Sequence, residues 1–516
     1  MWRRVLGWGC GFLLLGIAAA APPSGQLLNT RLAVVAGPWG GGEWILFGME
    51  ESDRDLNVDR DTADVVLAAA PASRLEAIPL GVALGGAAVT ASVQPPVAVC
   101  GRTAAVLVSE ADQGGRDLNG DGDARDDVLH LIDLSTRQVR NVGLAAEEVY
   151  GGRTGFAAIA LEARQGRDLT GDGDLADSAL FWVDVERARA TPIRPTGSGQ
   201  GLDASGGLAI AEDRLLVATS EQAQGRSDLN GDGDAADVVA FLVPGPNAEA
   251  TNLRLECATG FALTPQLAAL AVAEAAQGGR DLNGDGDTAD AVLFVYDLGR
   301  SEAINTQTDA SGGVAAGGGY AVAICAEANQ GGRDLNGDRD VEDAVAFVYT
   351  LARRQLQNTR LDAGDGAAVV GDAILLFCLE ADQGNRDLNG DRDPDDSVAH
   401  LFYPATGRAF NTGLCYSGDE AIAIAGTRVA FTLLEVDQGE RDLNGDRDTD
   451  DTVPVVVETA LNAIGSRILP IACTDIVAAA QECFAFAVPE IDQFDRDLNQ
   501  NGDTGDDVLH IFRWSR

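Results

Sequence analysis

The stretch DLNGDGDARD, residues 117–126, decides the fold because it recurs along the chain. Each of its nine copies is followed directly by an apolar run. The copies begin at Asp55, Asp117, Asp168, Asp228, Asp281, Asp334, Asp387, Asp442 and Asp497. Successive copies are 62, 51, 60, 53, 53, 53, 55 and 55 residues apart. Regular spacing near 50 residues is typical of a repeat architecture.

One repeat, residues 358–411, predicts four short strands. Its apolar runs are 367–370, 373–379, 398–403 and 408–414, and the acidic loop lies between the second and third. Turn residues separate the runs, and none is long enough or periodic enough for a helix. Four-stranded antiparallel units in series are the blades of a β-propeller.

The two ends of the chain predict a closed ring. Residues 26–32, QLLNTRL, nearly copy residues 355–361, QLQNTRL, which form a last strand. The final repeat stops at Arg516, directly after its third strand. We therefore expect the N-terminal strand to complete the last blade, which leaves no free sheet edge.

The predicted fold is all-β: one domain over 22–516, a closed propeller of about nine four-stranded blades. All nine acidic loops are expected on one face. One repeat is expected to be irregular, in one of the two long steps, at Pro95-Pro96 or at 197–201.

Composition limits the classes of partner. The net charge is −43, yet 46% of residues are hydrophobic, so the acidity does not indicate disorder. Such dense negative charge repels itself without bound cations and excludes a nucleic-acid interface, which needs a basic surface. All 37 basic residues are arginine, which excludes a Schiff-base lysine.

Residues 1–21 read as a secretory signal peptide. Arg3 and Arg4 form the positive end, residues 5–18 the apolar stretch and residues 19–21 a small-residue cleavage site. A membrane anchor is the weaker alternative, because the apolar run is short and no second run follows. We expect export, to the periplasm, the cell surface or the medium, and no transmembrane segment in the mature chain.

The acidic loops predict cation sites. Carboxylates at alternate positions, with an Asn among them, supply the oxygen ligands that Ca²⁺ requires. Gly at the sixth position permits a left-handed backbone. Several calcium ions, up to about nine, are expected.

Candidate ligands share loop positions one, three, five, seven and ten. Position one holds the Asp that begins each copy. Position three holds Asn57, Asn119, Thr170, Asn230, Asn283, Asn336, Asn389, Asn444 and Asn499. Position five holds Asp59, Asp121, Asp172, Asp232, Asp285, Asp338, Asp391, Asp446 and Asn501. Position seven holds Asp61, Asp123, Asp174, Asp234, Asp287, Asp340, Asp393, Asp448 and Asp503. Position ten holds Asp64, Asp126, Asp177, Asp237, Asp290, Asp343, Asp396, Asp451 and Asp506.

This loop resembles the calcium loops of FG-GAP repeats in integrin α-subunit propellers and their bacterial relatives. Its Asp-x-Asn-x-Asp-Gly core also resembles dockerin and EF-hand loops. The resemblance covers about ten residues per repeat and departs from both patterns, because the closing acid stands at position ten and no helices flank the loop. It implies calcium binding in a propeller, and it does not imply integrin function.

Four copies carry arginine at position six, where glycine is expected: Arg60, Arg339, Arg392 and Arg447. A non-glycine residue in the left-handed region costs on the order of 1 kcal/mol. Either these loops bend differently, or the arginine neutralises neighbouring carboxylates in a weaker site.

A glutamate precedes most loops: Glu110, Glu221, Glu274, Glu327, Glu380, Glu435 and Glu490. It either adds a cation ligand, holds the arginine before the loop, or is only a charged residue where a strand leaves the core. The recurrent Gln-Gly pairs, at Gln113, Gln277, Gln330 and Gln383, favour turn chemistry over a binding site.

No catalytic motif is present. His130, His400 and His510 share one strand position with aromatic residues of other copies, which favours packing. The leading hypothesis is a secreted calcium-binding propeller that acts as a binding, adhesion or scaffold module for a protein or polysaccharide at the cell surface. The alternatives are a calcium-dependent hydrolase or lyase, acting on polysaccharide or phosphoester, and a purely structural surface protein.

Overall fold

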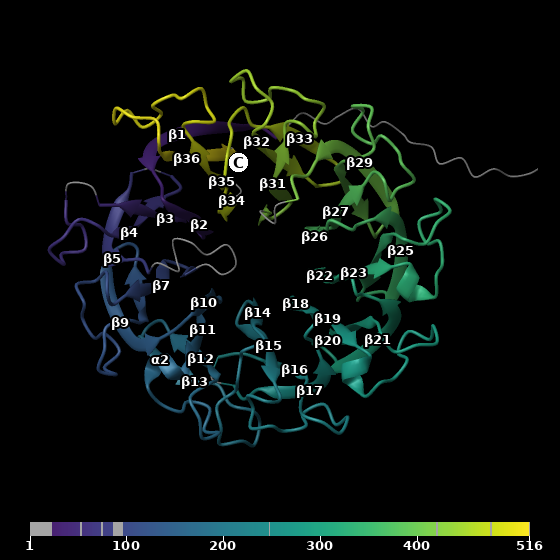
Figure 1. The fold of residues 1–516 in the computed structure, drawn as a ribbon, viewed down its shortest axis with the longest axis horizontal. Helices are drawn as coiled ribbons and strands as arrows, with labels where there is room; N and C mark the ends of the chain where they lie inside the picture. Colours follow the sequence, from purple (N-terminus) through teal and green to yellow (C-terminus); the bar gives the residue numbers. More distant parts are fainter. Residues whose placement is uncertain are drawn as a thin grey trace, which may run out of the picture.

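The computed structural model describes residues 23–51, 54–73, 76–85, 96–246, 248–418, 422–474 and 477–514. They form nine four-stranded antiparallel sheets around a central axis (Figure 1). The predicted all-β fold, a propeller of about nine blades, is confirmed. The predicted signal peptide and Pro95 lie outside the described residues.

In every blade the strands follow one another from the axis outward, except that β1 is the outer strand of the last blade. The innermost strands are β2 (Ala36–Gly41), β6 (Val97–Cys100), β10 (Glu148–Gly151), β14 (Leu208–Ala211), β18 (Gly260–Leu263), β22 (Val314–Gly317), β26 (Ala367–Val370), β30 (Ala423–Ala425) and β34 (Val477–Ala480). The second strands are β3 (Trp44–Glu50), β7 (Thr103–Ser109), β11 (Gly155–Leu161), β15 (Arg214–Ser220), β19 (Leu267–Ala273), β23 (Tyr320–Ala326), β27 (Ala373–Leu379), β31 (Arg428–Leu434) and β35 (Cys483–Pro489).

The two outer positions complete each sheet. The third strands are β4 (Val65–Pro71), β8 (Asp127–Asp133), β12 (Ser178–Asp184), β16 (Val238–Val243), β20 (Ala291–Asp297), β24 (Ala344–Thr350), β28 (Ser397–Tyr403), β32 (Thr452–Glu458) and β36 (Asp507–Trp514). The outermost strands are β5 (Ile78–Ala83), β9 (Gln138–Ala145), β13 (Arg189–Pro192), β17 (Thr251–Glu256), β21 (Glu302–Asp309), β25 (Gln355–Asp362), β29 (Arg408–Cys415), β33 (Gly465–Ile468) and β1 (Gly25–Ala33). The helices of the described residues are single turns before acidic loops: α2 (Glu162–Gln165), η1 (Ala275–Gln277) and η2 (Ala328–Gln330).

The core lies between the blades. Strand β27, sequence AILLFCL, is buried along almost its whole length, because neighbouring blades cover both faces of its sheet. Nine apolar clusters, one at each junction between blades, hold the ring together. Phe377 of blade seven, for example, packs edge-on against Phe431 of blade eight at a centroid distance of 5.5 Å.

The last blade is completed by β1. It pairs antiparallel with β36, from Gly25 opposite Trp514 to Ala33 opposite Val508. The Nδ2 of Asn29 in β1 donates to the Leu498 carbonyl, as the Nδ2 of Asn358 in β25 donates to the Leu335 carbonyl. β1 therefore makes the contacts of an ordinary outer strand.

The innermost strands of the last and first blades approach closely. A Cβ atom on Gly40 of β2 would lie 1.9 Å from the carbonyl oxygen of Ala479 in β34. Only glycine fits there without displacing a strand.

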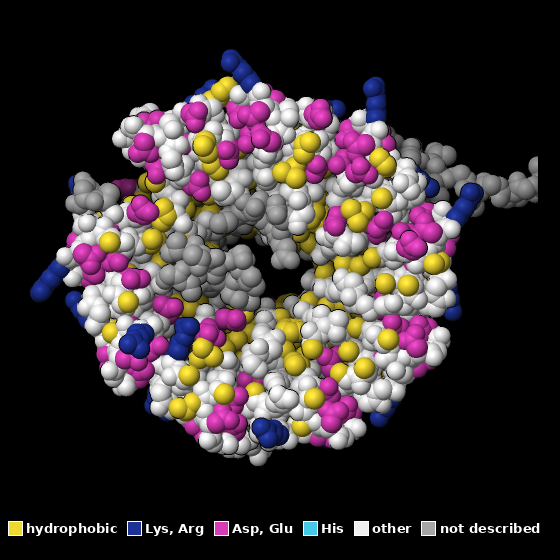
Figure 2. Space-filling model, in the orientation of Figure 1, with side chains coloured by type: hydrophobic (Ala, Val, Ile, Leu, Met, Phe, Trp, Pro, Cys, Tyr) yellow, Lys and Arg dark blue, Asp and Glu magenta, His cyan; other side chains and the backbone are white. Residues whose placement is uncertain are grey.

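Each acidic loop connects the second and third strands of its blade. Figure 2 shows acidic side chains in clusters spaced around one face of the ring. In the repeat used for the sequence analysis, β26 and β27 have the predicted bounds, and β28 and β29 are each one residue longer. Among the described residues, no helix is long and apolar enough to cross a membrane.

Candidate metal centres

The first Asp of each loop binds the loop backbone. In the second loop, Asp117 Oδ1 accepts a hydrogen bond from the Gly120 N–H at 2.6 Å, and its Oδ2 accepts one from the Gly122 N–H at 3.1 Å. The following side chains continue this pattern, since Asn119 Oδ1 accepts from Asp121 N–H and Asp121 Oδ1 accepts from Asp123 N–H. These bonds fold ten residues into a tight turn without regular secondary structure.

A buried glutamate accepts hydrogen bonds from the backbone of each acidic loop. Glu110 Oε1 accepts the Leu118 N–H at 2.5 Å, and its Oε2 accepts the Asp126 N–H at 3.1 Å. Glu110 is fully buried. The glutamate therefore holds the loop backbone, and no ion pair in the described part of the chain joins it to the arginine before the loop.

Two of the nine glutamates were missed by the sequence analysis. Glu51 and Glu162 make the same contact, to Asn57 N–H and Thr170 N–H respectively. They lie four and six residues before their loops, whereas the others lie seven before. The different linker lengths hid them, although each stands at the end of a second strand.

The carboxylates at positions seven and ten converge on this glutamate. In the second loop, Glu110, Asp123 and Asp126 each offer an oxygen within 4.8 Å of the other two. The equivalent three residues meet in the first, fourth and fifth loops. The third loop joins four carboxylates, Glu162, Asp172, Asp174 and Asp177. The predicted ligands therefore have two roles. The Asp at position one accepts hydrogen bonds from the loop backbone, whereas the Asp residues at positions seven and ten lie close to the glutamate.

Without a positive charge nearby, these clustered carboxylates destabilise the folded state when they are ionised. Burial first, and then neighbouring carboxylates, raise the pKa of Asp126, Asp237 and Asp290 to about 6. The same causes raise the pKa of Asp343 and Asp451 to about 7.

One buried oxygen has no hydrogen-bond partner in six of the loops. It is the Oε2 of Glu51, Glu162, Glu274, Glu327, Glu380 and Glu435. A buried anionic oxygen without a donor is destabilising by more than a kcal/mol, on the order of the desolvation cost of the group. A hard cation would satisfy it, and every donor atom in the group is a carboxylate oxygen, which fits Ca²⁺.

The position-three Asn joins neighbouring blades. Its Nδ2 donates both to the position-ten carboxylate of its own loop and, in seven loops, to a backbone carbonyl of the next blade. Asn336 of blade six, for example, donates to the Asp382 carbonyl of blade seven at 2.8 Å.

The recurrent glutamine binds in the opposite direction. Gln383 Oε1 of blade seven accepts the Asp362 N–H of blade six at 2.9 Å, and its Nε2 donates to the Arg360 carbonyl. The sequence favoured turn chemistry here, and the side chain instead joins two blades. Its fixed place three residues after the glutamate was visible, but the direction of its contact was not.

The arginine loops keep the backbone of the glycine loops. Position six has φ between 90° and 97° at its four arginines and between 107° and 112° at its five glycines. The backbone N–H of Arg392 donates to Asp387 Oδ2 at 3.2 Å, as Gly122 N–H does to Asp117. The alternative that these loops bend differently is therefore wrong. In the described part of the chain, no ion pair joins these four arginines to a carboxylate.

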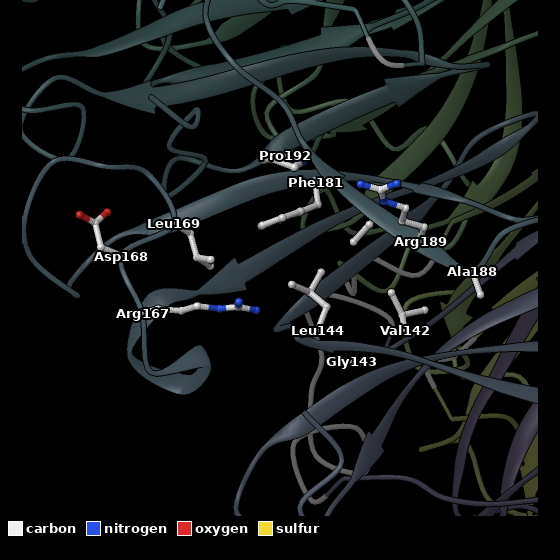
Figure 3. Close-up of a pocket in the computed structure, with 11 residues that line it drawn as sticks. Val142, Gly143, Leu144, Arg167, Asp168, Leu169, Phe181, Ala188, Arg189 and Pro192 are labelled. Atoms are coloured by element: carbon white, nitrogen blue, oxygen red, sulfur yellow. The ribbon is translucent and has the colours of Figure 1, made fainter. Parts of the chain in front are cut away.

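The third blade is irregular. Its outer strand β13 has four residues, and the inserted residues 197–201 lie against the third loop, where Gly201 N–H donates to the Thr170 carbonyl at 2.7 Å. A cleft of about 420 Å³ lies between β9 and the β12–β13 pair, and Arg167, Phe181 and Arg189 are among the residues that line it (Figure 3). A second cleft, of about 470 Å³, is lined by Asp172, Asp174 and Asp177 of the third loop.

Histidines and cysteines are parts of the packing. His130, His400 and His510 are buried, with each Nδ1 about 3 Å from the carbonyl oxygen two residues before it. Burial lowers the pKa of all three. The seven cysteines of the described residues are buried.

No protein-family model and no curated protein matches the chain. Among solved structures, it is similar to BamB from Moraxella catarrhalis, with 10% identity, 96% of this chain and 100% of that chain covered, and a TM-score of 0.35. An oligogalacturonate lyase from Vibrio parahaemolyticus has 10% identity, coverage of 92% and 98%, and a TM-score of 0.35. The β-propeller domain of the Trilobed protease from Pyrococcus furiosus has 7% identity, coverage of 74% and 95%, and a TM-score of 0.35. Similarities of this size carry no argument about function.

Proposed function

We propose that this protein is an exported calcium-binding β-propeller that serves as a binding or scaffold module. The observation that carries the proposal is the convergence of three or four carboxylates in each described group, beside a buried glutamate oxygen that has no partner in six of the loops. Such a group is stable when a divalent cation neutralises it.

The glutamate and the Asp residues at positions seven and ten would hold the ion. In the fifth loop these are Glu274, Asp287 and Asp290. Bound calcium would supply positive charge to the loop and fix the second strand to the third. The same loop contacts the next blade through Asn283, whose Nδ2 donates to the Asn329 carbonyl at 2.9 Å. Occupied loops would therefore stiffen the junctions between blades.

The acidic face gives the module a working surface that depends on calcium. With cations bound, the loops offer positive centres between carboxylates to a partner, which we take to be a protein or polysaccharide at the cell surface. Without them the net charge of −43 opposes any acidic partner.

The test is a count of tightly bound calcium in the purified mature protein, with thermal melts in calcium, magnesium and chelator. We expect between five and nine ions, following the number of loops, and a large loss of stability on chelation. A ligand at 100 times its dissociation constant stabilises the folded state by about 2.7 kcal/mol per site. Two or fewer ions, with unchanged melting, would overturn the proposal.

A matched pair of variants makes the count specific. Asp287→Asn should remove one ion, because Asp287 belongs to the fifth group. Asp372→Asn changes an exposed carboxylate in the turn between β26 and β27, and should remove none.

The binding role needs its own experiment. We expect the calcium-loaded protein to retain specific partners from envelope extracts and the chelated protein to lose them. Turnover of polysaccharide or phosphoester substrates that requires calcium would instead favour the hydrolase or lyase alternative.

A further inference from the structure

The third loop departs from the other eight at one decisive contact. In those eight loops the Nδ2 of the position-three Asn donates to the position-ten carboxylate, at 2.5 to 2.9 Å. This amide partly satisfies the carboxylate when no cation is present. The third loop has Thr170 in place of Asn, and a threonine hydroxyl replaces two amide protons with one proton on a shorter side chain.

The third loop has three buried oxygens without a hydrogen-bond partner, of which the glutamate oxygen is also unpartnered in five other loops. They are Glu162 Oε2, Thr170 Oγ1 and Asp177 Oδ2. The three residues are 0%, 1% and 7% exposed. Because buried polar atoms are almost always hydrogen-bonded, three such atoms in one turn indicate a missing partner that is positive.

The same loop gathers the larger carboxylate group. Asp172, at position five, joins Glu162, Asp174 and Asp177 within 4.8 Å, whereas the described groups of the first, second, fourth and fifth loops contain three carboxylates each. Four carboxylates repel one another more strongly than three, so the empty loop is less stable and gains more when it is filled.

We propose that the third loop is the tightest calcium site of the ring and fills before the others. The inference rests on the proposed function and assigns the strongest binding to the copy that has Thr170 in place of Asn. The cleft beside the loop is lined by Asp172, Asp174 and Asp177, so the ion enters without movement of a strand.

The test is calorimetric titration of the chelator-stripped protein with calcium, in competition with a chelator of known affinity. The wild type should show one tight site followed by a weaker set. Thr170→Asn should weaken the tight site by about tenfold, the factor that corresponds to one hydrogen bond to a charged group, without changing the total number of ions. The reciprocal variant, Asn230→Thr in the fourth loop, should create a second tight site.

The outcomes separate the two proposals. If the wild type binds no calcium, the proposed function itself fails. If it binds several ions, but Thr170→Asn leaves the tight site unchanged, or Asn230→Thr adds none, the hierarchy of sites is wrong while calcium binding stands. Asp177→Asn is a second variant, which tests the proposal even if Thr170→Asn fails to fold. It should abolish the tight site while the remaining sites still bind calcium.

Discussion

The glycine loops and the arginine loops have the same backbone conformation at position six, although they carry different residues there. Gly286 of the fifth loop and Arg339 of the sixth both lie at positive φ, 110° and 97°. Glycine adopts this conformation at little cost, whereas arginine is strained there. In both loops the first Asp accepts the N–H of the residue three positions later, and the buried glutamate accepts two loop N–H groups. These shared bonds, and not the residue at position six, set the turn. The lesson is that strain in one residue is tolerated where other bonds determine the backbone.

The largest expected effect comes from removing the buried glutamate in either kind of loop. Glu274→Ala and Glu327→Ala each remove the acceptor of two backbone N–H groups at the loop's start, those of Leu282 and Asn283 or of Leu335 and Asn336. We expect each variant to lose about 3 kcal/mol in calcium, by analogy with hydrogen bonds to charged groups. Urea unfolding measures the loss.

The comparison predicts equal losses in both loops. Glu342→Ala, an exposed change in the sixth loop, should stay within about 0.5 kcal/mol of wild type. A much smaller loss for Glu327→Ala than for Glu274→Ala would mean that the arginine loop is held by other bonds.

The next largest effect is expected in how the stability of the chelated protein depends on pH. The folded state raises the pKa of Asp396 to about 7 and that of Asp290 to about 6, chiefly by burial, from an ordinary value of 3.8. A raised folded pKa makes the native state bind more protons, so this contribution to stability is fully present below the ordinary pKa of 3.8 and is lost as pH rises to 6 or 7. Three buried histidines act in the opposite sense but are outnumbered by the eight raised position-ten carboxylates.

We therefore expect the metal-free protein to melt at a higher temperature at pH 5.5 than at pH 7.5, and the calcium-loaded protein to show the reverse. Asp396→Asn should flatten the profile from about pH 4 to about pH 7, and Asp290→Asn from about pH 4 to about pH 6, so between pH 6 and 7 the first variant has the larger effect. Each change is at most about 1.4 kcal/mol per pH unit. A chelated protein that is less stable at pH 5.5 would contradict the assignment.

The smallest effect on stability is expected from exchanging glycine and arginine at position six. Gly286→Arg should destabilise the protein by about 1 kcal/mol, and Arg339→Gly should stabilise it by a similar amount, because only position six changes. Denaturation midpoints in calcium measure both. If Arg339→Gly destabilises instead, the arginine makes a favourable contact that outweighs its strain.

Sequence predicted the blade but not how its loops are held. The apolar runs 367–370 and 373–379 are strands β26 and β27, because a blade buried on both faces needs continuous apolar residues. The copy of the outer strand at 26–32 also indicated that β1 lies beside β36. Spacing could not show that Asp117 binds backbone N–H groups while Asp123 and Asp126 meet Glu110, because that division depends on side-chain direction in three dimensions.

The hydrogen bonds between blades were likewise invisible to sequence. Gln383 and Asn336 cross the same junction in opposite directions, and each contact is made by residues 20 to 50 positions apart. Repetition marks such residues as important to each unit but gives no sign of which unit they contact.

The reciprocal bonds of Asn336 and Gln383 couple blades six and seven, and the Asn bond to the next blade recurs in six other loops. In a linear repeat array, such coupling is interrupted at the ends, and special capping units must seal them. A ring closed by β1 and β36 has no end units, so every blade is braced from both sides. Damage to one loop would therefore weaken two junctions, and an ion bound at one loop would be felt by the blades on either side.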